Sequence, residues 1–78
     1  MNIELRHLRY FAAVAGESSF TAAAGRLHVA QQVLSAQIRQ LEDALGVRLL
    51  ERTSRGVSLT SAGAAFLDGA QDTLASLD

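Results

Sequence analysis

One amphipathic segment constrains the fold more than any other part of the chain. It runs from Ala30 to Leu45, with the sequence AQQVLSAQIRQLEDAL. Its large apolar residues are separated by four, three and four positions, which is the spacing of one stripe along an α-helix: Leu34, Ile38, Leu41 and Leu45. The segment is therefore predicted to be a helix that buries this stripe in a core.

The opposite side of this helix carries amides, a hydroxyl, a methyl group and one guanidinium. Its residues are Gln32, Ala36, Arg39 and Asp43, with Ser35 and Gln40 on the flanks and Gln31 in the first turn. Amides and guanidinium groups can pair with base edges, and a helix is narrow enough to enter the major groove of DNA. Such a face, taken alone, is more often ordinary solvated surface. Its interpretation therefore depends on the neighbouring segments.

Length and composition indicate one small domain without a membrane span. The chain has 78 residues, of which 49% are hydrophobic, and it contains no cysteine. No apolar run approaches the ~18 residues that a transmembrane helix needs. The N-terminus lacks the basic start and continuous apolar block of a signal peptide. We expect a cytoplasmic protein with no membrane partner, no cofactor and no metal site.

The distribution of charge is more informative than its total. The net charge of −1 argues against nucleic acid, because phosphate binding requires excess cations. Residues 1–60, however, hold all seven arginines against five acidic residues, a net +2, whereas residues 61–78 hold three aspartates. The planar guanidinium group suits phosphate and guanine. The first three quarters of the chain therefore remain compatible with a DNA partner.

Two helices are predicted before the central one. The first spans residues 4 to about 15, with Glu4 in its first turn and its apolar side formed by Leu5, Leu8, Phe11, Ala12 and Ala15. Ser19 is a good N-cap for a short second helix, Phe20 to Leu27. The buried positions of that helix would be Phe20, Ala23, Ala24 and Leu27. Its small alanines would let the third helix cross closely over it.

The connection His28-Val29-Ala30 is short enough for a tight turn with a buried Val29. A short helix, a tight turn and a longer helix with a polar outward face form a helix-turn-helix. Its second helix would lie in the major groove, and Ser19 and Thr21 at the start of the first would be available to a phosphate. His7 and His28 are interpreted as capping or surface residues rather than as catalytic groups.

A small hairpin is predicted after the central helix, which Gly46 ends. Residues 47–50 and 57–59 are short β-favouring runs, and the segment between them carries Arg52, Arg55 and Gly56. An ordinary solvated loop is the alternative. Directly after a helix-turn-helix, however, such a wing is placed to contact DNA, with arginines at the minor groove or the phosphates.

Thr60 is predicted to cap a final helix from about residue 61 to the end. One stripe of this helix is largely apolar and is predicted to dimerise: Phe66, Ala70, Thr73, Leu74 and Leu77. A second copy is the simplest partner, because DNA readers of this type are usually two-fold dimers. Alternatively the helix packs back over the first helix. Both arrangements could hold at different positions.

The sequence resembles the N-terminal DNA-binding domain of LysR-type transcriptional regulators. The resemblance covers nearly the whole chain and is most specific in SFTAAAGRLHV, LSAQIRQLEDALGVRLLER and RGVSLTSAG. It implies a mainly α winged helix-turn-helix over residues 1–59 and a linker or dimerisation helix over residues 60–78. It also implies a homodimer on an interrupted inverted repeat, and a tetramer in a full-length protein. A small-molecule effector would bind only through a C-terminal domain outside this sequence.

The family's usual DNA contacts carry over onto six matching positions. They are Gln31, Ser35, Gln37 and Arg39 in the central helix and Arg52 and Arg55 in the wing. Three positions depart from the family pattern. Ala30 replaces the common serine N-cap, Gln32 offers an amide where the family often has proline or serine, and Ala36 replaces a common arginine. We therefore expect altered base specificity and weaker phosphate anchoring, with the wing contributing more.

Two other classes of function are alternatives to DNA binding. A non-catalytic helical interaction or dimerisation module with weakened DNA binding would be compatible with Ala30, Ala36 and the net charge of −1. An enzyme fits less well, because the sequence has no cysteine, two separated histidines, no phosphate-binding loop and no suitable carboxylate pair. Sequence-specific binding of double-stranded DNA is the leading hypothesis.

Overall fold

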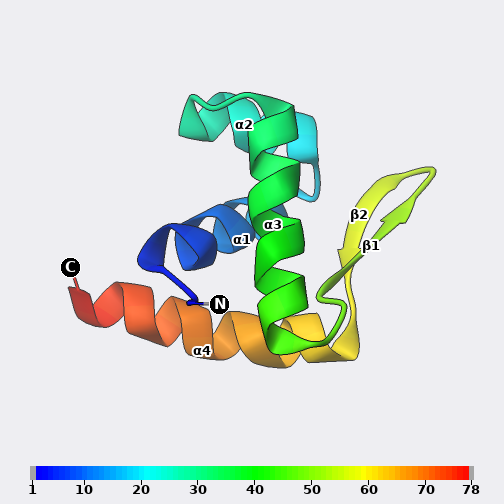
Figure 1. The fold of residues 1–78 in the computed structure, drawn as a ribbon. Helices are drawn as coiled ribbons and strands as arrows, with labels where there is room; N and C mark the ends of the chain where they lie inside the picture. Colours follow the sequence, from blue (N-terminus) through cyan, green and yellow to red (C-terminus); the bar gives the residue numbers. More distant parts are fainter. Residues whose placement is uncertain (1, 78) are drawn as a thin grey trace.

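The predicted winged helix-turn-helix is confirmed. A computed structural model of the chain describes residues 2–77. Along them run α1 (Leu5–Glu17), α2 (Phe20–Leu27), α3 (Gln31–Leu45), β1 (Leu50–Thr53), β2 (Gly56–Leu59) and α4 (Ser61–Leu77). In Figure 1, α3 stands in front of α1, α4 crosses below the C-terminal end of α3, and the β1–β2 hairpin projects to one side. Within the described part, no helix is long and apolar enough to cross a membrane.

Both ends of α1 differ from the prediction. Glu4 is the extended N-cap residue rather than a member of the first turn, and the helix continues to Glu17. The buried side of α1 is also rotated from the predicted stripe, since Leu5 is 40% exposed while His7, Phe11 and Val14 are buried. These three residues share one face at helical spacing. Hydrophobicity alone could not identify a face that includes a buried histidine.

The helix-turn-helix follows the predicted bounds. The Ser19 hydroxyl accepts a hydrogen bond from the backbone N–H of Ala22 at 3.1 Å, which confirms the cap of α2. His28 ends α2 in the left-handed conformation, with φ 59°. Val29, which was predicted to be buried, is half-buried. Gly46 ends α3 in the same conformation, with φ 72°. One core cluster joins the small face of α2 to the apolar stripe of α3: Phe20, Ala23, Ala24, Leu34, Ile38 and Leu41.

The hairpin is shorter and begins later than predicted. Residues 47–49 precede β1, and Val47 is 45% exposed, whereas Leu49 and Leu50 are buried. The antiparallel register pairs Leu50 with Leu59 and Thr53 with Gly56, so only Ser54 and Arg55 form the turn. Gly56 has φ 125°, and a Cβ atom there would lie 2.7 Å from the Ser18 carbonyl oxygen. Val57 N–H donates to that same oxygen at 3.2 Å. The wing is therefore attached to the turn between α1 and α2.

The first half of α4 packs against its own chain. The Thr60 hydroxyl accepts from the backbone N–H of Gly63 at 2.9 Å, which confirms the predicted cap. The ring of Phe66 meets that of Phe11 edge-on, with centroids 5.6 Å apart, and Ala70 is 4% exposed. The alternative of packing over α1 thus holds for Phe66. Towards the C-terminus, Leu74 is half-buried, and Thr73 and Leu77 are exposed.

Candidate nucleic-acid interface

The outward face of α3 presents most of the predicted contact residues together. Gln31, Gln32, Ala36 and Arg39 are exposed, Ser35 is half-buried, and all five line one shallow hollow. The buried stripe of α3 directs this face to solvent, because Leu34, Ile38 and Leu41 occupy the opposite side. Amide, hydroxyl and guanidinium groups are thus available on a single helix surface.

The start of α2 adjoins this face. Thr21 is exposed, and its hydroxyl donates to the Gln31 side-chain oxygen at 3.2 Å. Ser19 is half-buried, and its hydroxyl is occupied by the capping bond from Ala22. Of the two predicted phosphate contacts, Thr21 is therefore the more accessible, and it is coupled to the first residue of α3.

Arg52 lies against the helix-turn-helix rather than extending freely from the wing. One of its guanidinium nitrogens donates to the Ser35 hydroxyl at 3.1 Å. Its guanidinium carbon lies 4.1 Å from the centroid of the Phe20 ring, a cation–π contact. Arg55, by contrast, is an exposed residue in the hairpin turn. The two wing arginines therefore occupy different places, one beside α3 and one at the tip.

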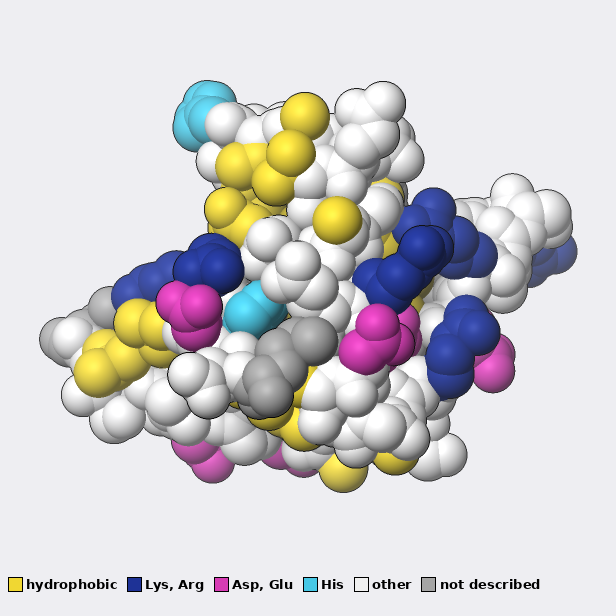
Figure 2. Space-filling view, in the orientation of Figure 1, with side chains coloured by type: hydrophobic (Ala, Val, Ile, Leu, Met, Phe, Trp, Pro, Cys, Tyr) yellow, Lys and Arg dark blue, Asp and Glu magenta, His cyan; other side chains and the backbone are white. Residues whose placement is uncertain are grey.

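Basic side chains gather in the hollow between α3 and the wing. Figure 2 shows arginines collected on the wing side of α3, with acidic side chains below them. This hollow is lined by Ser35, Arg39, Arg48 and Arg52, and also by Glu42 and Asp43. The positive charge thus adjoins the amide-rich face of α3. The arrangement suits a polyanion that covers both surfaces.

Glu42 is a structural residue that sequence reasoning missed. One of its carboxylate oxygens accepts from the backbone N–H of Leu49 at 2.7 Å and from that of Leu50 at 3.2 Å. These bonds satisfy two backbone N–H groups at the point where the chain turns from α3 into β1. The only local signal for this role was an acidic residue near the end of α3, where it is unfavourable to the helix dipole.

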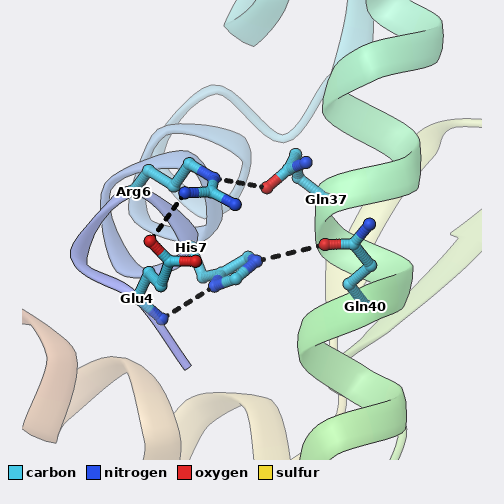
Figure 3. Close-up of polar contacts among 5 residues, drawn as sticks. All are labelled: Glu4, Arg6, His7, Gln37 and Gln40. Carbon is cyan, nitrogen blue, oxygen red and sulfur yellow. Dashed lines mark hydrogen bonds and ion pairs between the residues drawn. The ribbon is translucent and has the colours of Figure 1, made fainter. Parts of the chain in front are cut away.

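Gln37 and Gln40 point towards α1 (Figure 3). The Arg6 Nε donates to the Gln37 side-chain oxygen at 3.0 Å, and an Arg6 Nη lies 2.8 Å from a Glu4 carboxylate oxygen. Gln37 is half-buried. It therefore belongs to the α1–α3 contact, although the resemblance placed it among the DNA-binding residues.

His7 links the same two helices from a buried position. Its Nδ1 accepts from the backbone N–H of Glu4 at 2.9 Å. In the neutral ring the proton then lies on Nε2, which faces the Gln40 side-chain oxygen at 3.4 Å. Of the two predicted alternatives, a capping or a surface residue, the capping role is confirmed; His7 is buried, at 2% exposed. His28 is an exposed helix cap.

Comparison with known proteins identifies the family. The model of the bacterial regulatory helix-turn-helix proteins of the lysR family matches residues 5–64. The Hca operon transcriptional activator HcaR of Escherichia coli (strain K12) is 57% identical over 76 residues, which are 97% of this chain and 25% of HcaR. The regulator BenM of Acinetobacter baylyi is 53% identical over 97% of this chain and 25% of BenM. The chain thus spans about a quarter of these curated relatives.

Solved structures share the same fold. The BenM DNA-binding domain in complex with catB site 1 DNA has a TM-score of 0.94 and 53% identity, covering 97% of this chain and 85% of that one. Full-length CbnR complexed with its target DNA has a TM-score of 0.89 and 51% identity, covering 92% of this chain and 25% of that one. On the family match and these similarities, the chain belongs to the LysR family of bacterial regulatory helix-turn-helix proteins.

Proposed function

We propose that this chain binds double-stranded DNA sequence-specifically as a dimer and is the DNA-binding part of a LysR-type transcriptional regulator. The observation that carries the proposal is the bond between Arg52 and Ser35, which joins the wing to the outward face of α3. A helix and a wing held in a fixed relation can enter adjacent grooves together. Similar domains, 53% and 51% identical to this one, form complexes with DNA.

Each element has a separate role in this proposal. Gln31, Gln32, Ser35 and Arg39 face base edges in the major groove, and Arg52 stands beside them at the phosphates. Thr21 and the N-terminal turn of α2, capped by Ser19, contact a phosphate. Arg55 at the wing tip reaches the minor groove. Gln37 acts indirectly, since its contact with Arg6 positions α3.

The dimer forms through the C-terminal half of α4. Residues 1–59 make up the DNA-binding unit, and residues 60–78 the linker helix. Thr73, Leu74 and Leu77 supply the contact between copies, because Thr73 and Leu77 are exposed and Leu74 is half-buried. Phe66 and Ala70 pack within one chain and hold α4 in the position from which the other three residues contact the second copy. Two copies related by a two-fold axis would match an interrupted inverted repeat.

The remaining properties concern a longer protein. The curated relatives are about four times the length of this chain. We propose that a full-length protein forms a tetramer, acts in the cytoplasm and receives its small-molecule effector through a C-terminal domain. In this proposal the DNA-binding part has no catalytic role, in keeping with relatives that are named as transcriptional regulators.

Selection from random duplexes tests the proposal. The purified chain is expected to enrich an interrupted palindrome whose half-sites are about one helical turn apart. A charge-reversed variant, Arg39→Glu, serves as the control and should enrich no sequence. If the folded wild-type chain also enriches none, sequence-specific binding is excluded, and a non-catalytic interaction module becomes the better interpretation.

A further inference from the structure

The outward face of α3 contains an apolar patch formed by Val33 and Ala36. Val33 is 49% exposed, and Ala36 is also exposed. The two residues are three positions apart, so their side chains are neighbours on the helix surface. Val33 does not belong to the core cluster found in the described residues. A half-exposed β-branched residue next to an exposed alanine therefore contributes little to packing and is available to a ligand.

Polar and basic groups surround this patch. Gln32 lies one turn before Ala36, and Arg39 lies one turn after it; both are exposed and line the same hollow as Ala36. Gln31 and Gln37 already accept hydrogen bonds from Thr21 and Arg6. With the arginines beside the wing, this setting favours a polyanion with small apolar groups over an apolar protein surface. Duplex DNA is such a partner.

The chemistry of the major groove identifies the apolar group. Thymine presents a 5-methyl group there, and adenine presents N6 and N7, which an amide side chain can bind with two hydrogen bonds. Side chains four positions apart on a helix have Cβ atoms roughly 5–6 Å apart, and successive bases on one strand are about 3.4 Å apart. Gln32 and Ala36 can thus contact base pairs that are one or two steps apart.

We propose that Ala36 and Val33 form a specificity surface for the 5-methyl group of thymine, within two base pairs of an adenine bound by Gln32. This inference rests on the proposed DNA-binding function and deepens it. It makes Ala36 a determinant of specificity. Contact with the thymine methyl group would thus account for the altered base preference that the sequence predicts.

Thymine-to-uracil substitution tests the proposal directly, because it removes the methyl group and keeps every hydrogen-bonding group. Each thymine of the selected site is replaced in turn by deoxyuridine, and affinity is measured by fluorescence anisotropy. One or two thymines in each half-site should show a loss of roughly threefold to fivefold, as expected for one buried methyl group. The other thymines should show none.

A double-mutant cycle assigns the effect to Ala36. Ala36→Gly is measured on the thymine and uracil sites, so that any cost to helix stability cancels in the comparison. The uracil effect should fall to less than twofold in this variant. Val33→Ala should reduce it partly, and Ala65→Gly, at an exposed position of α4, should leave it unchanged.

The possible failures are distinguishable. If the chain binds its selected site but every uracil duplex binds as tightly as its thymine counterpart, this inference is wrong while the proposed function stands. The same holds if Ala36→Gly keeps the full uracil effect. If Val33→Ser instead abolishes self-association in sedimentation, with no uracil effect, the patch contacts a second copy and the inference is also wrong. Failure to bind any duplex overturns the proposed function itself.

Discussion

The Glu42 carboxylate accepts a hydrogen bond from the backbone N–H of Leu49 at 2.7 Å. A residue near the end of α3 thus holds the backbone of the segment that leads into the wing. The same oxygen accepts from Leu50 at 3.2 Å. In both hydrogen bonds the acceptor is a carboxylate, and such charge-assisted hydrogen bonds are among the stronger ones in proteins. Glu42 therefore helps to hold the wing in position relative to α3, together with the bond from Arg52 to Ser35.

Glu42→Ala should lower the free energy of unfolding by about 1–3 kcal/mol, because two N–H groups lose their acceptor. Glu42→Gln should cost less, since its amide oxygen can still accept. Urea denaturation measures both. Asp43→Ala is the matched control, as Asp43 is the exposed adjacent residue. Equal stability for Glu42→Ala and Asp43→Ala would mean that the two hydrogen bonds do not hold the wing in solution.

Gly63 should tolerate no side chain. A Cβ atom at Gly63 would overlap the carbonyl oxygen of Leu49 and lie 2.9 Å from its carbonyl carbon, whereas a Cβ atom at Gly69 would meet nothing within 4 Å. Gly63→Ala should therefore destabilise the domain, by roughly 1–3 kcal/mol as for other overpacked sites. Gly69→Ala should stabilise it by about 0.5–1 kcal/mol through helix propensity. Thermal unfolding of both variants makes the comparison, and equal shifts would rule out the close approach of α4 to Leu49.

The two wing arginines should behave differently on removal. Arg55→Gln should weaken binding most on sites with A·T-rich flanks, whose narrow minor groove attracts arginine. Arg52→Gln should weaken binding on all flanks and also lower stability, because Arg52 contacts Phe20 and Ser35. Anisotropy on matched A·T and G·C flanks, together with urea denaturation, separates these effects. Equal losses for Arg55→Gln on both flanks would contradict insertion into the minor groove.

Separate residues of α4 should control folding and dimerisation. Phe66→Asp should unfold the domain, because Phe66 packs on Phe11. Leu77→Asp should leave the monomer folded but shift it out of the dimer, because Leu77 is 57% exposed. Sedimentation velocity and circular dichroism report the two properties. An unchanged sedimentation profile for Leu77→Asp would exclude this end of the helix from the dimer contact.

Features encoded by neighbouring residues could be predicted from the sequence. The Ser19 and Thr60 caps, the Gly46 terminus and the stripe on α3 each depend on spacings of a few positions, and the structure confirms them. The fold class followed from their order. The outward face of α3 followed as well, because assigning its buried stripe determines the opposite side.

The features that sequence reasoning missed depend on contacts between distant residues. Glu42 accepts hydrogen bonds from backbone N–H groups seven and eight positions later in the chain. His7 on α1 faces Gln40 on α3. Neither partner is visible in a local pattern. The buried face of α1 differs from the predicted stripe because the hydrogen-bonded His7 occupies a buried position in it. The packing of Phe66 on Phe11 joins residues 55 positions apart in the chain, so no local pattern predicts it.

The most direct test of the central claim compares the selected palindrome with a scrambled duplex of the same composition across a salt series. Sequence-specific recognition predicts tighter binding to the palindrome at every salt concentration, by roughly a thousandfold or more. The logarithm of its affinity should fall linearly with that of the salt concentration, with a slope of about −0.9 for each phosphate neutralised. Equal affinities for the two duplexes, or affinities independent of salt, would contradict the account.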